Sequence, residues 1–386
     1  MLSRNIMKIG VLTYWYGNSN YGMILQCWAL QQYLKKKGHE PFVIRYQPKQ
    51  TAWKRVVKEL ILLLKGCMSS EKRIAYRQSK LQQLHNSQKD KERCFQTFRD
   101  EHLTMSDCFY QSLKHLQNTP PEADCYIAGS DQIWSNQLKP NRASAYYLHF
   151  GPKEVKRVAY APSFGTVKYD GKNQSLLADA LKALNAISCR ENEGVEVCKR
   201  AGFDASKVED PTMLLSKEDY MPLLESSTVN TPIFIYSVNM QSADDIYWND
   251  LVKIFAKKDI VITPSSGSIS GGELFGNDIK YIYATVGEWL SLINNSQLVI
   301  TSSFHGVVFS IIFNKRFCFV PLKGTYSKTN NRIFDLLDSL ELNDFIVNTP
   351  KDYKRIIESN IDWSKVEERK VTLLSDSYRF LQNALA

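Results

Sequence analysis

The feature that most constrains the fold is a repeated alternation of short apolar runs with helical patterns. The first run, residues 8–14, is followed by a Gly/Asn loop at 16–20, a helical pattern from Tyr21 and a second apolar run at 41–46. Apolar runs of this length suit strands that are buried on both faces of a parallel sheet. Because a strand, a helix and a second strand make one βαβ unit, the opening of the chain already predicts an α/β fold.

The alternation continues in two series. Further strands are predicted at 124–128, 157–160, 186–189, around Val208, and at 233–237, 259–263, 298–301 and 316–320. Chains longer than about 250–300 residues usually divide into domains, and this chain has 386 residues. The sequence therefore predicts two Rossmann-like domains facing each other across a cleft, residues 1–215 and 232–370. A last helix, 371–386, is expected to pack at the domain junction.

A basic segment interrupts the first series as a helical insertion at about 51–100. From Thr51 to Arg99 there are twelve Lys or Arg against four Asp or Glu, a net charge of +8 within a chain of +9. Apolar residues recur at helical spacing over 53–65 with basic residues between them, a pattern that fits an anionic membrane surface. Peripheral contact with the inner face of the membrane is therefore one expectation. Nucleic acid is not an expected partner, because the segment lacks a recognisable recognition module.

The cysteine spacing and the apolar stretches predict the cellular compartment and whether the chain has a metal site. The eight cysteines are scattered, with no Cys-x-x-Cys pair and no Cys/His cluster of zinc spacing, so we expect reduced thiols and no metal site. The chain shows no signal-peptide pattern and no apolar stretch near the ~20 residues that span a bilayer. These patterns predict a cytoplasmic protein.

Ligands of open parallel sheets bind beyond the carboxyl ends of the strands. Three loops follow predicted strands and precede helices, where free backbone N–H groups suit a phosphate or a carboxylate. The first contains Asn20, which can donate or cap, and Gly22, which permits close approach; its alternative is a simple turn. The second presents Ser130 and Asp131, whose alternative is to cap the next helix.

The third loop contains His305 between a predicted strand and a nearly all-apolar helix, a position where a buried core needs no imidazole. The near-neutral pKa of histidine suits proton transfer or contact with phosphate, and the alternative is a satisfied structural histidine. Ser303 and Gly306 lie in the same loop. Lys315, at the end of the following helix, is either a further ligand in the cleft or a solvated lysine.

Arg190 directly follows the predicted strand 186–189 and should project at the same edge of the first sheet. A guanidinium there suits bidentate capture of a carboxylate or phosphate. The alternative is a salt bridge with Glu191 or Glu193.

Together these loops resemble the polysaccharide pyruvyl transferase family. The matching segments are Ile9-Gly-Val-Leu-Thr13, Asn20-Tyr-Gly22, Leu25-Gln26, Ala128-Gly-Ser-Asp-Gln-Ile-Trp134, Tyr160-Ala-Pro-Ser-Phe-Gly165, Ile187-Ser-Cys-Arg-Glu191, Val208-Glu-Asp-Pro-Thr212 and Thr301-Ser-Ser-Phe-His-Gly306. The resemblance implies a glycosyltransferase-B-like fold. It also implies transfer of a pyruvyl group from phosphoenolpyruvate, with no cofactor, to a sugar of a surface polysaccharide or its lipid-linked precursor, which gives a ketal.

The resemblance also implies roles for the loop residues. In the family an Arg-Leu-His triplet helps to hold the donor, and the corresponding residues here are Ser303-Phe304-His305. His305 therefore matches while the arginine is missing, and Arg190 or Arg332 can supply the charge. His305 is predicted as proton donor or phosphate ligand and Asp131 as base. The predicted donor-binding residues are Arg190, Ser303, His305, Gly306, Lys315 and Arg332. The predicted acceptor-binding residues are Asn20, Gly22, Ser130 and Asp131.

Two other functions fit the same fold, because fold alone does not decide function. One is a nucleotide-sugar-dependent glycosyltransferase. Such enzymes often hold the ribose with a carboxylate of the second domain, and residues 302–325 contain no Asp or Glu. The other is a non-catalytic assembly protein that contacts the membrane surface through the basic helix 53–65.

Overall fold

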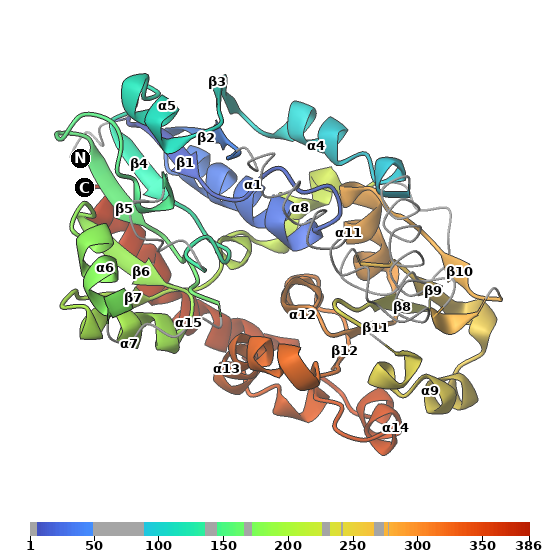
Figure 1. The fold of residues 1–386 in the computed structure, drawn as a ribbon. Helices are drawn as coiled ribbons and strands as arrows, with labels where there is room; N and C mark the ends of the chain where they lie inside the picture. The colour runs from blue at the N-terminus through green and yellow to red at the C-terminus, as the bar shows by residue number, and fades with distance from the viewer. Residues whose placement is uncertain are drawn as a thin grey trace, which may run out of the picture.

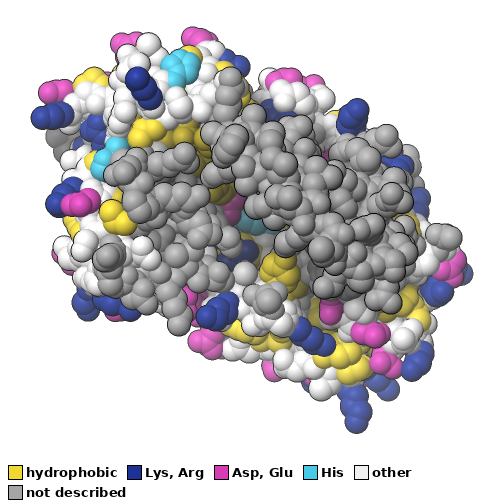
Figure 2. Space-filling view, viewed as in Figure 1, with side chains coloured by type: hydrophobic (Ala, Val, Ile, Leu, Met, Phe, Trp, Pro, Cys, Tyr) yellow, Lys and Arg dark blue, Asp and Glu magenta, His cyan; other side chains and the backbone are white. Residues whose placement is uncertain are grey.

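The computed structural model describes residues 6–48, 89–135, 145–165, 172–225, 232–240, 242–265, 274–276 and 278–386. Figure 1 shows the arrangement of their helices and strands, and Figure 2 shows the side chains on the same face of the molecule. The expected basic helix 53–65 lies outside the described residues. Within the described residues two parallel sheets lie on either side of a layer of helices, which confirms the predicted α/β class.

The first sheet has seven parallel strands in the order β3-β2-β1-β4-β5-β6-β7. They are β1 (Lys8–Leu12), β2 (Glu40–Tyr46), β3 (Met105–Tyr110), β4 (Cys125–Ala128), β5 (Lys156–Ala159), β6 (Ala186–Cys189) and β7 (Ser206–Lys207). The sequence did not predict β3. Its residues include buried, partly buried and exposed positions, because it is an edge strand and carries no continuous apolar run.

The second sheet has five parallel strands in the order β10-β9-β8-β11-β12. They are β8 (Ile233–Tyr236), β9 (Ile260–Ile262), β10 (Lys280–Tyr281), β11 (Leu298–Thr301) and β12 (Phe317–Phe319). The strand β10 was not predicted, and with two residues it is too short to leave a pattern in the sequence.

Helices cover the sheets on both sides. They are α1 (Tyr21–Lys36), α4 (Phe95–His102), α5 (Leu113–Asn118), α6 (Lys172–Leu181), α7 (Asn192–Arg200), α8 (Lys217–Tyr220), α9 (Trp248–Ile254), α11 (Val286–Asn295), α12 (Phe304–Ile312), α13 (Asn331–Ser339), α14 (Lys351–Glu358) and α15 (Trp363–Ala384). None of the helices in the described part of the chain has both the length and the apolar composition needed to span a bilayer.

Each sheet reverses its strand order at one place, and this reversal positions the candidate site. In the first sheet the reversal lies between β1 and β4, and in the second between β8 and β11. Leu12 pairs with Ala128, and Tyr236 pairs with Thr301, so each pair of strands ends at the same level. Loops that leave two neighbouring strands in opposite directions open a crevice at the carboxyl edge, which is the usual ligand site of such sheets.

Helix α1 lies between the two sheets (Figure 1) and packs against α12. Thirteen of its sixteen residues are buried, as expected for a helix that contacts protein on every side. Asn20 caps its first turn by accepting a hydrogen bond from the backbone N–H of Met23 at 3.1 Å. The first unit contains β1 to β7, and the second unit contains β8 to β12. One continuous apolar core includes residues of both sheets, so the two units pack against each other through this helix.

The amino end of α1 is held in the second unit by Tyr21. Its ring stacks on Trp289 of α11 at 5.0 Å, and its hydroxyl donates to the carbonyl of Ala284 at 2.6 Å. Arg93, which is 1% exposed, donates to the Tyr21 hydroxyl and to the carbonyl of Pro264. Arg93 therefore joins the segment before α4 to both units.

We expect Arg93→Ala to lower the free energy of unfolding by about 3 kcal/mol, because buried polar groups lose their partner. Urea unfolding followed by circular dichroism measures this. The matched control is Lys91→Ala, an exposed residue two positions earlier, which should change stability by less than about 0.5 kcal/mol. An Arg93→Ala protein as stable as the control would contradict the junction role.

The last helix, α15, returns from the second unit to the first (Figure 1). The Ser377 hydroxyl accepts a hydrogen bond from the backbone N–H of Glu209 at 2.9 Å, and Tyr378 stacks on Tyr33 of α1 at 5.8 Å. This helix therefore packs against the segment that follows β7. The same segment contains Asp210, which lies at the centre of the candidate site.

Candidate active site

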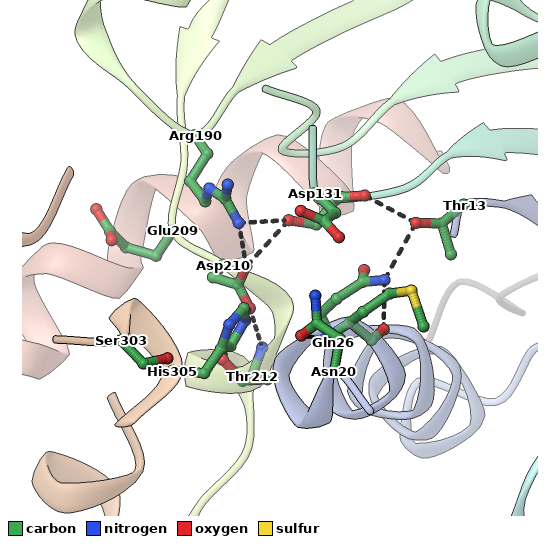
Figure 3. A network of polar contacts seen from close by, with 12 residues as sticks. Thr13, Asn20, Gln26, Asp131, Arg190, Glu209, Asp210, Thr212, Ser303 and His305 are labelled. Atoms are coloured by element: carbon green, nitrogen blue, oxygen red, sulfur yellow. Dashed lines mark hydrogen bonds and ion pairs between the residues drawn. The ribbon is translucent and has the colours of Figure 1, made fainter. Parts of the chain in front are cut away.

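Asp210 is the centre of a buried polar network that lies where the two units meet (Figure 3). Its Oδ2 accepts hydrogen bonds from Arg190 Nη1 at 2.8 Å and from the Ser130 hydroxyl at 3.0 Å. Its Oδ1 accepts from the backbone N–H and the hydroxyl of Thr212 at 3.0 and 2.8 Å. Asp210 thus connects the end of β6 with the loop after β4.

The charges around Asp210 keep it ionised. Burial alone would raise the pKa of the Asp210 carboxyl, but His305, Arg190 and the hydrogen bond from the Thr212 N–H outweigh it and hold the pKa far below its ordinary value. The site therefore contains a fixed negative charge beside the Arg190 guanidinium and the His305 imidazole.

His305 reaches this network from the second unit. It lies in the first turn of α12, where the Ser303 hydroxyl caps the helix by accepting from the Gly306 N–H at 3.4 Å. The Nε2 atom is 3.6 Å from Asp210 Oδ1, an ion-pair distance when the imidazole is protonated. That nitrogen is buried and has no hydrogen-bond partner within the described part of the chain.

Gly22 of α1 packs directly against the His305 imidazole. A Cβ at this position would overlap the imidazole, with Nδ1 as the nearest atom. Glycine here lets the helix of the first unit approach the histidine of the second. Gly306 has a similar role within α12, because a Cβ there would overlap the hydroxyl of Thr301.

We expect Gly22→Ala to displace His305 and to lower the rate of the pyruvyl transfer that the resemblance implies at least about tenfold, since a shift near 1 Å in a reacting group can cost far more. Gly38→Ala is a control for the loss of a glycine at the other end of the same helix, where a Cβ meets open space. Because Gly38 has a φ of +88°, its replacement should lower stability while leaving the turnover of the folded enzyme unchanged. Turnover of Gly22→Ala equal to that of the wild type would contradict the displacement.

Two arginines lie against the ring of Phe304, beside His305. The guanidinium carbons of Arg190 and Arg332 are 5.2 and 4.9 Å from the ring centroid, and the imidazole centroid is 5.1 Å away. Burial and the positive charge of Arg190 lower the pKa of Arg332 to about 10. Nη2 of Arg190 and Nε of Arg332 are buried without a hydrogen-bond acceptor in the described residues.

Arg190 also forms a salt bridge with Glu191, which was the alternative to a role in ligand binding. Its Nε donates to Glu191 Oε1 at 3.1 Å, in addition to the bond to Asp210. Its Nη1 also lies 3.5 Å from the Ser130 hydroxyl, so Nη2 is the nitrogen left for a ligand.

The loops after β1 and β4 are joined through Thr13 and Gln26. The Thr13 hydroxyl donates to the carbonyl of Ser130 at 2.7 Å and accepts from Gln26 Nε2 at 3.1 Å. Gln26 Nε2 also donates to the carbonyl of Met23 at 2.9 Å. These bonds hold α1 and the Ser130 loop in one position relative to Asp210 (Figure 3).

The four residues predicted to bind the acceptor differ in how deeply they are buried. Asp131 is half-buried, has a φ of +79° and accepts the backbone N–H of Gln132 at 2.8 Å, close enough to raise the pKa of Arg190 by its charge. Ser130 and Gly22 are buried within the protein, and Asn20 is exposed while its side-chain oxygen caps α1.

Lys315 is not brought to this cluster. It follows the carboxyl end of α12, so the length of that nine-residue helix, about 13 Å, separates it from His305. Burial and the nearby charge of Lys217 lower its pKa.

Sequence reasoning missed several residues that the structure places at this site. Asp210, Thr212 and Thr13 were present only as parts of segments that carried the resemblance. The signal for Asp210 is the Asp-Pro-Thr order, which is typical of a residue that caps a short helix. Among the described residues no group of three or more His, Cys, Asp or Glu side chains is arranged to hold a metal ion.

Comparisons with known proteins address the family and the fold. A family model described as polysaccharide pyruvyl transferase matches residues 20–323. Comparison with curated proteins finds no significant match.

Among solved structures, the chain is similar to UDP-N-acetylglucosamine 2-epimerase from Rickettsia bellii, with a TM-score of 0.50, 9% identity and coverage of 99% of this chain and 97% of that chain. It is also similar to an alpha-glucosyltransferase solved with UDP and a 13-mer DNA, with a TM-score of 0.50, 10% identity and coverage of 99% and 100%. At such identities the likeness shows the fold alone, which is two Rossmann-like domains of the glycosyltransferase-B type. Because the family model spans most of the chain, the protein belongs to the polysaccharide pyruvyl transferase family.

Proposed function

We propose that the protein transfers a pyruvyl group from phosphoenolpyruvate to a sugar of a surface polysaccharide or of its lipid-linked precursor, forming a ketal. The observation that carries the proposal is a pair of buried arginine nitrogens without hydrogen-bond acceptors in the described residues, Arg190 Nη2 and Arg332 Nε. Both guanidinium groups and the His305 imidazole lie around the ring of Phe304. Buried donors of this kind need an acceptor, and an anion supplies one.

Phosphoenolpyruvate has the chemistry that these groups suit. It carries a carboxylate and a phosphate, and guanidinium groups bind both kinds of oxyanion. The missing arginine before Phe304 and His305 is then replaced by Arg190 and Arg332, which approach the same ring from other elements. A dianionic ligand would also relieve the repulsion between these two arginines, which lowers the pKa of Arg332.

The reaction needs one acid and one base. Protonation of the methylene carbon makes the neighbouring carbon electrophilic, and a first sugar hydroxyl adds there while its proton passes to a base. The carbon–oxygen bond to phosphate then breaks, a second hydroxyl closes the ketal, and its proton leaves on hydrogen phosphate. The products are one ketal and one inorganic phosphate, with no redox change.

His305 is proposed as the acid that protonates the methylene carbon, or as the donor to the phosphate. Asp131 is proposed as the base, because its carboxylate is half-buried beside Arg190. Asp210 is proposed as a positioning residue, since it contacts both Arg190 and His305 and lies too deeply buried to meet a substrate itself. A carboxylate that orients an imidazole commonly determines which nitrogen carries the proton.

The test is phosphate release from phosphoenolpyruvate by the purified full chain, with and without galactosyl, glucosyl and mannosyl acceptors, including lipid-linked ones. We expect release that depends on one acceptor, with a product heavier by one pyruvyl group in mass spectrometry. Absence of release across the panel, together with binding of a nucleotide sugar, would instead favour a glycosyltransferase.

A further inference from the structure

A pocket of about 280 Å³ lies beside the predicted anion site, between the amino ends of α7 and α13. Helix α7 belongs to the first unit and α13 to the second unit. Two residues that line the pocket also neighbour Arg190. Glu191 accepts a hydrogen bond from Arg190, and the positive charge of Arg190 acts on Arg332. A ligand in this pocket would therefore touch a donor held by the two arginines.

The polar lining of the pocket consists mainly of amides and carboxylates. These residues are Gln132, Glu191, Asn192, Glu193, Asn331 and Asp335. Amides donate and accept hydrogen bonds, and carboxylates accept them, which matches hydroxyl groups that do both. Phe164 and Phe334 add apolar walls, and the faces of such rings attract the weakly positive C–H groups of a saccharide.

The charge of the pocket disfavours a second anion. Its three carboxylates, Glu191, Glu193 and Asp335, outnumber its two cations, Lys328 and Arg332. Burial and the negative charges of Glu191 and Glu193 raise the pKa of Asp335 above its ordinary value, against the opposing charge of Lys207. A neutral ligand with many hydroxyls meets no such repulsion.

A long contact between the two units bridges the pocket. Asn331 Nδ2 of α13 donates to Glu193 Oε1 of α7 at 3.5 Å, a length at which a hydrogen bond is weak. A sugar hydroxyl can replace this contact with shorter bonds to both side chains. The pocket volume is slightly below that of usual small-molecule pockets, about 300–1,000 Å³, and suits one sugar ring.

We propose that this pocket binds the sugar ring of the acceptor, with Asp335 and Glu193 as hydroxyl acceptors and Phe164 and Phe334 against its apolar face. The proposal rests on the proposed pyruvyl transfer for the identity of the reaction. It also places the acceptor away from Asn20, Gly22 and Ser130, none of which lines this pocket, and keeps it next to Asp131 through the adjacent Gln132.

The experiment measures binding of methyl galactoside, methyl glucoside and methyl mannoside to the full chain by saturation-transfer NMR, and binding of phosphoenolpyruvate by calorimetry. Two variants alter the pocket: Asn331→Trp fills it from an exposed position, and Asp335→Asn removes one acceptor charge. The matched control is Asp338→Asn, three residues further along α13 and outside the pocket lining. Thermal unfolding confirms that each variant is folded.

We expect at least one glycoside to bind the wild-type protein. Asp335→Asn should raise its Kd about tenfold, because the hydrogen bond loses its charged acceptor. Asn331→Trp should abolish binding. Asp338→Asn should match the wild type in all measurements. Failure of every glycoside to bind, or binding unchanged by both pocket variants, would overturn the saccharide site. Pocket-dependent glycoside binding without phosphoenolpyruvate binding or phosphate release would support the site and refute the proposed donor.

Discussion

His305→Ala is expected to lower the rate of acceptor-dependent phosphate release by about 10²- to 10⁴-fold, the usual effect of removing a general acid. The imidazole is held between Gly22, Asp210 and Phe304. The variant should still fold, because Asp210 keeps its hydrogen bonds from Arg190, Ser130 and Thr212 when the imidazole is removed.

A second substitution separates the two roles proposed for this residue. His305→Gln keeps an N–H donor but cannot supply a proton, so it should be as inactive as His305→Ala if the histidine is the acid. Recovery of most of the activity in His305→Gln would indicate a phosphate ligand instead. The control is His102→Ala, which removes an imidazole that is 36% exposed on α4. Near-normal turnover of His305→Ala would refute both roles.

Asp210→Asn is expected to destabilise the protein by about 3–5 kcal/mol at neutral pH, because it leaves a buried guanidinium without one of its counter-charges. Arg190 would keep Glu191 but lose the 2.8 Å bond to a charged partner. It should also lower the turnover of the folded enzyme, since Arg190 and His305 both lose the group that orients them. Chemical unfolding and phosphate release measure the two effects.

Glu209→Gln is the matched control for this variant. Glu209 is the preceding residue and is also buried, but its carboxylate pairs with Lys207 at 2.6 Å rather than with the site. We expect this variant to keep normal turnover, whatever its effect on stability. Equal loss of turnover in both variants would show that any buried charge in this segment matters and would remove the specific role of Asp210.

The stability effect of Asp210→Asn should depend on pH in a defined direction. The pKa of Asp210 is lowered in the folded protein, so its contribution to stability is fully present above the unfolded value of about 3.9 and is lost as the pH falls through the folded value. The difference between wild type and variant should therefore be largest at neutral pH and shrink in acid below about pH 4. A difference that grows on acidification would contradict the buried ion pairs.

Local patterns were sufficient for most of the fold. The apolar runs that became β1, β2, β4 to β6, β8, β9, β11 and β12 lie in two parallel sheets, because a strand buried on both faces must be apolar along its length. Edge strands carry no such requirement, which is why β3 and β10 left no clear pattern. The prediction that loops after the strands would converge also followed from general geometry, since parallel strands present their carboxyl ends at one edge.

The sequence by itself determined the α/β class, the family and the loops that contain Ser130, Arg190 and His305. Only the tertiary structure decided how these loops combine. Asp210 holds Arg190 of its own unit and meets His305 across the junction, and the pocket joins acids of α7 to Asp335 of α13. These contacts join residues that are distant in the sequence, 20 positions apart for Arg190 and Asp210 and 95 for Asp210 and His305, and no local preference of the chain encodes them. They arise because α1 and α12 bury their apolar surfaces against each other and so fix the two crevices face to face.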